Sequence, residues 1–372
     1  MKKLAPVVFL ILTFPLAGAP RRRAVSIPAV PAVTRASVSA TALRVIDRTQ
    51  IPAFEPRLHW ENAPYFDGTL LVAEQLHRDD LIERMAAFLL NSNDNIDSIH
   101  WGDGTAFSQA LLDLDRLLPP NDPRRAQIPP MLNGPMAFAE HAMRATPQTA
   151  PPRNPWWVQG GYGVRYWQDD MYMVIPWLAM YGSIDPKARE LANEWIDAYV
   201  ARLWDPQHDL FQHAPETIGS DEFWGRGNGW SVYGLARAGA PQTRQLLQRA
   251  AARLVEKRLP SGGWPSNLSR PLECPVVETS ATGLITAFLA RGVNEGWLDR
   301  ETYTPIVLRA FAVLMDRVDA EGAVHGIQPP GTGPAFCGAG MLSTNQTTIN
   351  VNYGAGAVLL AAGEVLRLPE MR

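Results

Sequence analysis

Amphipathic helical periodicity dominates the chain from residue 54 onward. The clearest segment places apolar side chains on one stripe from Ala188 through Trp195 to Leu203, with Pro186 near its start and Pro206 just after its end. Comparable segments cover residues 64–75, 80–91, 105–118, 135–144, 170–181, 229–238, 242–258, 280–295, 300–318 and 354–366. Because long alternating strand patterns are missing, the sequence predicts one all-α domain.

The connections between these segments bear on how the helices are arranged. A helical solenoid repeats its sequence at a fixed period of roughly 30 to 45 residues, and no such repeat is found in this chain. The connections are alternately short and long, and Gly, Pro and Trp residues gather in them. Such connections suit either architecture, so the missing repeat alone favours a closed double ring of helices with its functional loops around one mouth.

The first 53 residues have a different character. Lys2 and Lys3 precede an apolar run over residues 4–17, which has the build of a secretory signal and is too short to span a bilayer comfortably. We therefore expect residues 1–19 to be a signal peptide and the protein to be exported. Residues 20–53 are rich in Ala, Val, Pro, Ser and Thr without sustained helical spacing, which predicts a linker ahead of a folded domain over residues 54–372.

Composition restricts the partners and cofactors. A formal net charge of -3 and a pI near 6.2 give no basic field for nucleic acid or for an anionic membrane surface, so an acidic ligand needs local cations. Metal, nucleotide and redox fingerprints and a serine-nucleophile elbow are missing from the sequence. The chemistry is therefore expected to come from acids, amides and ring donors, without a cofactor. Cys274 and Cys337 form at most one disulfide.

Two clusters of acids precede predicted helices. Asp169 and Asp170 stand at the start of the helix predicted over 170–181, directly after aromatic residues that include Trp167. Asp97 and Asp103 lie earlier in the sequence, in the segment that leads into the helix predicted over 105–118. Each acid could simply cap its helix. The alternative is catalytic, because sugar hydrolysis generally uses two acids facing one cleft, one exchanging a proton and the other handling water.

A glycine-relaxed aromatic stretch from Phe223 to Trp230 contains one permanent cation, Arg226. Arg226 could pair with a carboxylate through two hydrogen bonds, and Trp224 or Trp230 could stack on a pyranose face. The alternative is a structural turn with a core tryptophan. Upstream, His213 is either a hydrogen-bond donor to a ligand or a structural histidine.

Four motifs in this order resemble glycoside hydrolase families 88 and 105, the unsaturated uronyl hydrolases. They read Trp-Gln-Asp-Asp-Met-Tyr-Met at 167–173, Phe-Gln-His at 211–213, Phe-Trp-Gly-Arg-Gly-Asn-Gly-Trp at 223–230 and Glu-Thr-Ser-Ala at 278–281. The resemblance extends from about Trp60 to residues 353–357. It implies an (α/α)6 barrel of about twelve helices, no metal, and oligosaccharide substrates with a 4,5-unsaturated uronic acid at the non-reducing end.

The resemblance also assigns roles to residues. It gives the catalytic acid as Asp169 and the second acid as Asp97, with Asp103 as a rival for the second role. The substrate-binding positions that it implies are His213, Trp224, Arg226, Trp230 and Trp167, with a looser match at Trp60 and Tyr65. The implied reaction is hydration of a vinyl ether in the sugar ring. An ordinary acid/base glycosidase and a non-catalytic carbohydrate-binding toroid remain the alternatives.

Overall fold

A computed structural model describes residues 32–51, 53, 57–92, 102–144, 166–213, 222–346 and 348–371. The predicted signal peptide, residues 20–31 of the predicted linker and Asp97 lie outside these ranges. The described helices are α1 Arg35–Arg48, α2 Ala63–Leu76, α3 Asp79–Leu90, α4 Ser108–Leu117, α5 Ile128–Met131, α6 Asn133–Arg144, α8 Asp170–Met173, α9 Ile175–Tyr181, α10 Pro186–Leu203, α12 Gly225–Ala238, α13 Arg244–Glu256, α14 Thr279–Asn294, α15 Arg300–Met315 and α16 Asn352–Leu366.

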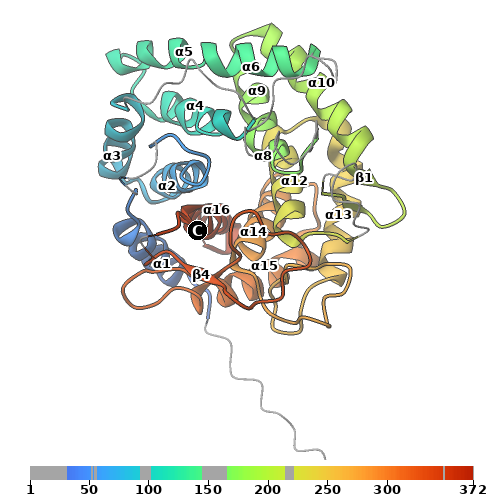
Figure 1. Cartoon of the computed structure of the whole chain (residues 1–372). Coiled ribbons are helices and arrows are strands. Elements are labelled where there is room, and N and C mark those ends of the chain that lie inside the picture. Colours follow the sequence, from blue (N-terminus) through green and yellow to red (C-terminus); the bar gives the residue numbers. More distant parts are fainter. Residues whose placement is uncertain are drawn as a thin grey trace, which may run out of the picture. The chain divides into compact units, whose positions relative to one another are not determined.

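Within residues 32–371 the helices form a closed double ring (Figure 1). The inner ring runs through α2, α4, the α8–α9 pair, α12, α14 and α16, and α16 closes it by packing against α2. The outer helices are α1, α3, the α5–α6 pair, α10, α13 and α15. This confirms the predicted all-α toroid, in which the described helices make up twelve units that alternate between the two rings.

Burial differs between the rings as this arrangement requires. Every residue of the inner helix α16 is buried. In the outer helix α13 the buried residues are Leu247, Ala250, Ala251 and Leu254, which form one stripe. An inner helix is covered on all sides, whereas an outer helix buries one face and turns the other to solvent.

The helix predicted over 170–181 is divided into α8 and α9 near Pro176. Because proline has no N–H, Pro176 cannot donate to the carbonyl of Tyr172 four residues earlier. The Gln109 side chain on α4 donates to that carbonyl instead, at 2.7 Å. The hydroxyl of Thr105 donates to the next carbonyl, that of Met173, at 2.9 Å. Two side chains from the preceding segment thus stabilise the interrupted helix.

Residues 35–48 form α1, so the prediction of a linker is wrong for this part of residues 20–53. Thr34 caps the helix by accepting from the backbone N–H of Ser37. Val38, Ala42 and Val45 are fully buried, and α1 packs against α16. These residues have helical spacing, but the small and polar residues between them obscured the pattern. The compact unit of the chain begins at Ala32 rather than at residue 54.

Two short pairs of antiparallel strands lie in the connections between helices. β1 Trp204–Asp205 pairs with β2 Leu210–Phe211, directly after α10. β3 His325–Ile327 pairs with β4 Leu342–Ser343, between α15 and α16. Among the described helices, none combines the length and the hydropathy that a membrane span needs.

Candidate active site

The predicted site residues gather where inner helices begin. Asp169 immediately precedes α8, Trp224 precedes α12, Glu278 precedes α14 and Tyr353 is the second residue of α16. Three of these, Trp224, Glu278 and Tyr353, hydrogen-bond to one residue, Gln328. We call this end of the inner ring the mouth. Helix N-termini carry partial positive charge, so the mouth favours a negatively charged ligand.

Six side chains form a continuous stack at the mouth, which we call the aromatic column: Trp60, Tyr353, Arg226, Trp224, His213 and Trp167. The Trp60 and Tyr353 rings stack with centroids 5.2 Å apart. The guanidinium carbon of Arg226 lies 4.9 Å from the Tyr353 ring centroid and 4.6 Å from that of Trp224. Because a cation is attracted to the face of an aromatic ring, Arg226 joins the two halves of the column.

His213 connects the column to the predicted catalytic acid. Its ring centroid lies 4.7 Å from that of Trp224 and 4.9 Å from that of Trp167, which it meets edge-on. Its Nδ1 is 3.7 Å from Oδ2 of Asp169. The segment that carries His213 thus brings the imidazole next to the Asp169 carboxyl group.

The two adjacent acids of the motif have different surroundings. The Asp169 side chain is 19% exposed, and it makes no capping hydrogen bond to α8. Asp170 is 2% exposed and accepts a hydrogen bond from the Tyr199 hydroxyl at 2.5 Å. It also lies so close to Gly102 that a Cβ there would be 2.2 Å from an Asp170 oxygen. Asp170 therefore holds helices together, whereas Asp169 is the acid that a ligand can reach.

His213 is placed by two amides that hold the strand before it. The Asn228 side chain on α12 accepts from the Phe211 backbone N–H at 2.8 Å and donates to the Phe211 carbonyl at 3.0 Å. Gln168 donates to the same carbonyl at 2.8 Å. Gln168 is the residue before Asp169, and Phe211 lies two residues before His213. The Gln168–Phe211 hydrogen bond therefore ties the backbone at Asp169 to the strand that leads to His213.

The stretch from Phe223 to Trp230 is mostly helical, since α12 begins at Gly225. Here the sequence predicted a relaxed loop with a helix from residue 229. The glycines serve close packing: a Cβ at Gly225 would lie 2.2 Å from the Pro265 carbonyl oxygen, and one at Gly227 would lie 2.1 Å from the Gln168 side-chain oxygen. The start of α12 can therefore approach both neighbours at the mouth.

Arg226 is almost completely buried, with 2% of its surface exposed. It donates from Nη1 to the carbonyl of Gln328 at 2.7 Å and from Nη2 to the carbonyl of Pro329 at 3.2 Å. Within the described part of the chain it forms no ion pair with a carboxylate. Burial raises the pKa of the neighbouring Tyr353 to about 12, against the opposing charge of Arg226, so the phenol stays neutral beside the cation.

Trp230 is fully buried and does not join the column. Its ring centroid lies 4.7 Å from that of Tyr172 on α8. Arg226 and Trp230 are four residues apart on one face of α12, which places Trp230 about 6 Å farther along the helix axis, away from the mouth. Its surroundings match the core tryptophan that the sequence left as an alternative to a sugar platform.

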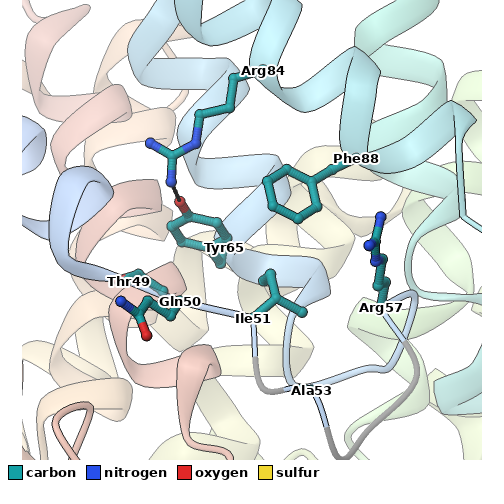
Figure 2. A pocket seen from close by; sticks show the side chains of 8 residues that line it. All are labelled: Thr49, Gln50, Ile51, Ala53, Arg57, Tyr65, Arg84 and Phe88. Atoms are coloured by element: carbon teal, nitrogen blue, oxygen red, sulfur yellow. Dashed lines mark hydrogen bonds between the residues drawn. The ribbon is translucent and has the colours of Figure 1, made fainter.

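Tyr65 lies in a different pocket (Figure 2). Its hydroxyl donates to the Ile46 carbonyl at 3.2 Å and accepts from Arg84 at 3.4 Å. The pocket, of about 420 Å³, is formed by the connection between α1 and α2 together with α2 and α3, and no residue of the aromatic column lines it. The structure therefore does not bring Tyr65 to the site predicted for it.

The structure does not choose between Asp97 and Asp103 as the second acid. Asp97 lies outside the described residues. Asp103 lies in the short 3-10 helix η1 Gly102–Thr105, next to the glycine that contacts Asp170. Over the described ranges, no group of three or more His, Cys, Asp and Glu side chains could hold a metal ion.

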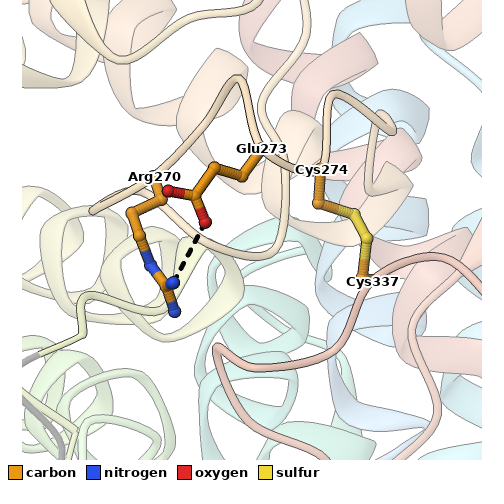
Figure 3. Close-up of a disulfide and its surroundings, with 4 residues drawn as sticks. All are labelled: Arg270, Glu273, Cys274 and Cys337. Carbon is orange, nitrogen blue, oxygen red and sulfur yellow. Dashed lines mark hydrogen bonds and ion pairs between the residues drawn. A yellow bond between two sulfur atoms is a disulfide. The ribbon is translucent and has the colours of Figure 1, made fainter.

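A disulfide joins Cys274 and Cys337, which the sequence left as an open possibility (Figure 3). Their Cα atoms are 5.6 Å apart. Cys274 lies four residues before Glu278, and Cys337 lies in the connection between β3 and β4. The bond therefore ties the β3–β4 connection to the segment that leads into α14.

A second polar cluster, the interior cluster, consists of Asp67, Tyr172, Asp113 and Arg237. The Tyr172 hydroxyl donates to Asp67 at 2.5 Å, and Arg237 donates to Asp113 at 2.7 Å. Burial raises the pKa of Asp67 to about 7; Arg237 opposes this shift, Asp113 adds to it and the Tyr172 hydrogen bond opposes it. The cluster links four units of the inner ring, α2, α4, α8 and α12.

The family model described as Glycosyl Hydrolase Family 88 matches residues 37–369. The chain belongs to glycosyl hydrolase family 88. The match begins inside α1, in agreement with the finding that this helix is part of the folded unit. It also spans every helix start that contributes to the mouth.

Relatives of this family 88 chain include two unsaturated 3S-rhamnoglycuronyl hydrolases. The protein from Formosa agariphila is 30% identical over 228 residues, which are 55% of this chain and 58% of the relative. The protein from Alteromonas sp. (strain LOR) is 29% identical over 227 residues, which are 56% and 53%. The chain thus matches little more than half the length of each. A solved glycosyl hydrolase family 88 structure from Bacteroides vulgatus shares the fold, with a TM-score of 0.67 and 23% identity over 90% of this chain and 99% of that one.

Several site residues of this family 88 chain were missed by sequence reasoning. Gln328 is far from the recognised motifs in sequence, and Tyr353 stands in the segment that ends the resemblance but was given no role there. Gln168 and Asn228 lie inside the motifs, but their role depends on the strand that they hold. Glu278 begins the fourth motif without an assigned role, and in the structure its carboxylate caps α14 by accepting from the backbone N–H groups of two α14 residues.

Proposed function

We propose that this protein is a glycoside hydrolase that removes a 4,5-unsaturated uronic acid from the non-reducing end of oligosaccharides. The family assignment supports a glycoside hydrolase. The names of the two curated relatives support an unsaturated glycuronyl substrate linked to rhamnose, which is the first substrate to test.

The observation that carries the proposal is the contrast between Asp169 and Asp170. Asp169 stands at the mouth beside His213 with part of its side chain exposed, while Asp170 is buried in contacts between helices. One acid is therefore available for proton exchange with a ligand. The aromatic column beside it offers ring faces for a sugar, and the buried charge of Arg226 attracts a sugar carboxylate.

In the proposed reaction, protonated Asp169 donates its proton to C4 of the C4=C5 double bond. Positive charge develops at C5 and on the ring oxygen. Water then adds at C5 and gives a proton back to the Asp169 carboxylate, which restores the acid. The resulting hemiketal opens to a ketone at C5 and a hemiacetal at C1, and the hemiacetal expels the aglycone as an alcohol.

Isotope labelling tests this reaction class. In deuterated water the hydration route deposits deuterium at C4, and in ¹⁸O-labelled water it places the label at C5, provided that the ketone is trapped before exchange. Direct glycosidic cleavage leaves C4 unlabelled and places ¹⁸O at the anomeric carbon. Cleavage of saturated uronosides at the same rate, without deuterium at C4, would favour the ordinary acid/base glycosidase.

A carbohydrate-binding toroid without catalysis makes a different prediction. The unsaturated uronic acid absorbs ultraviolet light through its conjugated double bond, and hydration removes this absorbance. A binding protein would retain affinity for the oligosaccharide without any loss of absorbance. Substitution of Asp169 would then leave the measured affinity unchanged.

We also propose that the protein is exported and that residues 1–19 are its signal peptide. The Cys274–Cys337 disulfide supports this proposal, because disulfides persist in oxidising compartments. Expression of the whole chain in a bacterium with a periplasm should yield protein in that compartment that starts at Pro20. Protein that stays in the cytoplasm and retains Met1 would argue against export.

A further inference from the structure

We propose that Gln328 is a positioning residue that holds the Trp224 indole, and through it the aromatic column, in the geometry that the catalytic acid needs. Gln328 directly follows β3, outside every motif recognised in the sequence. Its kinetic consequence rests on the proposed function. Its structural consequence can be tested without any substrate.

The side chain of Gln328 makes two hydrogen bonds, one through each polar atom. Its Oε1 accepts from Nε1 of Trp224 at 2.9 Å. Its Nε2 donates to the carbonyl of Gly333 at 2.8 Å. The residue is 0% exposed, so solvent does not compete for either partner in the folded protein. A buried indole N–H without an acceptor is costly, and the ring would be expected to move.

The backbone of Gln328 makes three more bonds, which fix the position from which its side chain extends. Its carbonyl accepts from Arg226 at 2.7 Å and from the Tyr353 hydroxyl at 2.6 Å. Its N–H donates to Oε1 of Glu278 at 3.0 Å. Glu278 is itself 0% exposed and caps α14. Residue 328 therefore joins the starts of α12, α14 and α16.

The Trp224 ring transmits this positioning to the acid. One neighbour of the ring is the Arg226 guanidinium at 4.6 Å, and another is the His213 ring at 4.7 Å. His213 in turn lies 3.7 Å from Asp169. The backbone bonds to Arg226 and Tyr353 survive a side-chain substitution at position 328. Within the column, only Trp224 therefore loses a hydrogen bond to residue 328.

The test is a double-mutant cycle between Gln328→Met and Trp224→Phe. Methionine keeps the length and apolar stem of glutamine, and phenylalanine keeps an aromatic ring but has no N–H to satisfy. Alone, Gln328→Met should lower kcat/KM by about 10- to 100-fold, because small misplacements of site residues have effects of this size. In the Trp224→Phe background the same substitution should cost at most a few-fold, because the N–H that it leaves unpaired is gone.

Two further variants separate positioning from general destabilisation. Gln328→Glu keeps an acceptor for the indole and, with its carboxyl protonated, a donor for the Gly333 carbonyl, so it should recover much of the lost kcat/KM. Gln248→Met, on the outer helix α13, removes a side-chain hydrogen bond to the Trp297 carbonyl and should leave kcat/KM at the wild-type value. If Gln328→Met retains wild-type kinetics, or if its effect is the same with and without the indole N–H, the proposal is wrong.

A substrate-free readout keeps this inference distinct from the proposed function. In protein labelled with ¹⁵N-tryptophan, the Trp224 indole signal is the one lost in Trp224→Phe. It should shift in Gln328→Met and return towards its wild-type position in Gln328→Glu. Wild-type protein that fails to hydrate the unsaturated sugar would remove the proposed function but leave this expectation in place. An unshifted Trp224 signal in Gln328→Met would overturn the positioning role whether or not the enzyme is active.

Discussion

The mouth and the interior cluster both contain acids, but the acids differ in their exposure to solvent. At the mouth, the Asp169 side chain is 19% exposed and lies 3.7 Å from a histidine nitrogen. In the interior cluster, Asp67 is fully buried and accepts from a tyrosine hydroxyl at 2.5 Å. An acid that exchanges protons with a ligand needs access to it, whereas an acid that joins helices is shielded. Exposure therefore separates the two roles better than residue type does.

The buried arginines of α12 show the same difference. Arg237 in the interior cluster pairs with Asp113 at 2.7 Å. Arg226 at the mouth is bonded to two carbonyls and stacked between two rings, and it has no ion pair within the described residues. The two are eleven residues apart, or about 16 Å along the helix. The charge of Arg237 is balanced by a carboxylate inside the protein, whereas that of Arg226 is the charge we propose to act on a ligand at the mouth.

The largest effect is expected at the mouth. Asp169→Asn should lower turnover by about 10²–10⁴-fold, as removal of a general acid/base generally does. Asp170→Asn should mainly lower stability, because its partner is the Tyr199 hydroxyl. The turnover of both variants is measured as the initial rate of ultraviolet absorbance loss per folded molecule. The stability of Asp170→Asn is measured as its free energy of unfolding. An inactive Asp170→Asn beside an active Asp169→Asn would reverse the assignment of the two acids.

The next effect concerns the interior cluster and should appear as stability rather than activity. Burial raises the pKa of Asp67 from 3.8 to about 7, so the folded state binds this proton more tightly than the unfolded state. The contribution of Asp67 is therefore most favourable below pH 4 and is lost as the pH rises to 7, by about 4 kcal/mol in total. Asp67→Asn has no proton to lose, so its stability relative to wild type should rise over this window.

Urea unfolding at several pH values between 4 and 8 measures this difference. Since other groups titrate in the same range, the quantity to compare is the free energy of unfolding of the variant minus that of wild type. A difference that stays constant with pH would mean that Asp67 is already ionised in the folded protein. Activity per folded molecule should be unchanged, which distinguishes the interior cluster from the mouth.

A smaller effect is expected from Arg226. Arg226→Ala should lower kcat/KM by about 10- to 100-fold, the range of a lost hydrogen bond to a charged group. Arg226→Lys keeps the charge but not the planar stack between Trp224 and Tyr353, and should recover only part of the loss. Calorimetry with the unsaturated disaccharide measures the binding affinity of each variant. Equal affinities of wild type and Arg226→Ala would remove this cation from substrate recognition.

Sequence reasoning predicted the ring better than the site, for a physical reason. Helical spacing is local, so the segments were found, although α1 was hidden by its small and polar residues. The column depends on contacts between distant segments: Gln328 lies 104 residues after Trp224. Even within one motif the error was conformational. The sequence predicted a loop up to residue 228, which would leave Trp230 near the mouth, whereas α12 begins at Gly225 and carries Trp230 into the core.

The smallest effect is expected at Tyr65, which the sequence placed in the substrate site and the structure places in a separate pocket. Tyr65→Phe removes the hydroxyl that donates to the Ile46 carbonyl, and should lower the free energy of unfolding by about 1 kcal/mol. Because this pocket contains no residue of the aromatic column, kcat and KM should both stay at wild-type values. The matched comparison is Tyr353→Phe, which removes a phenol hydroxyl inside the column at the Gln328 carbonyl and should raise KM. If Tyr65→Phe raised KM as much as Tyr353→Phe does, the pocket beside α2 and α3 would have to be counted as part of the mouth.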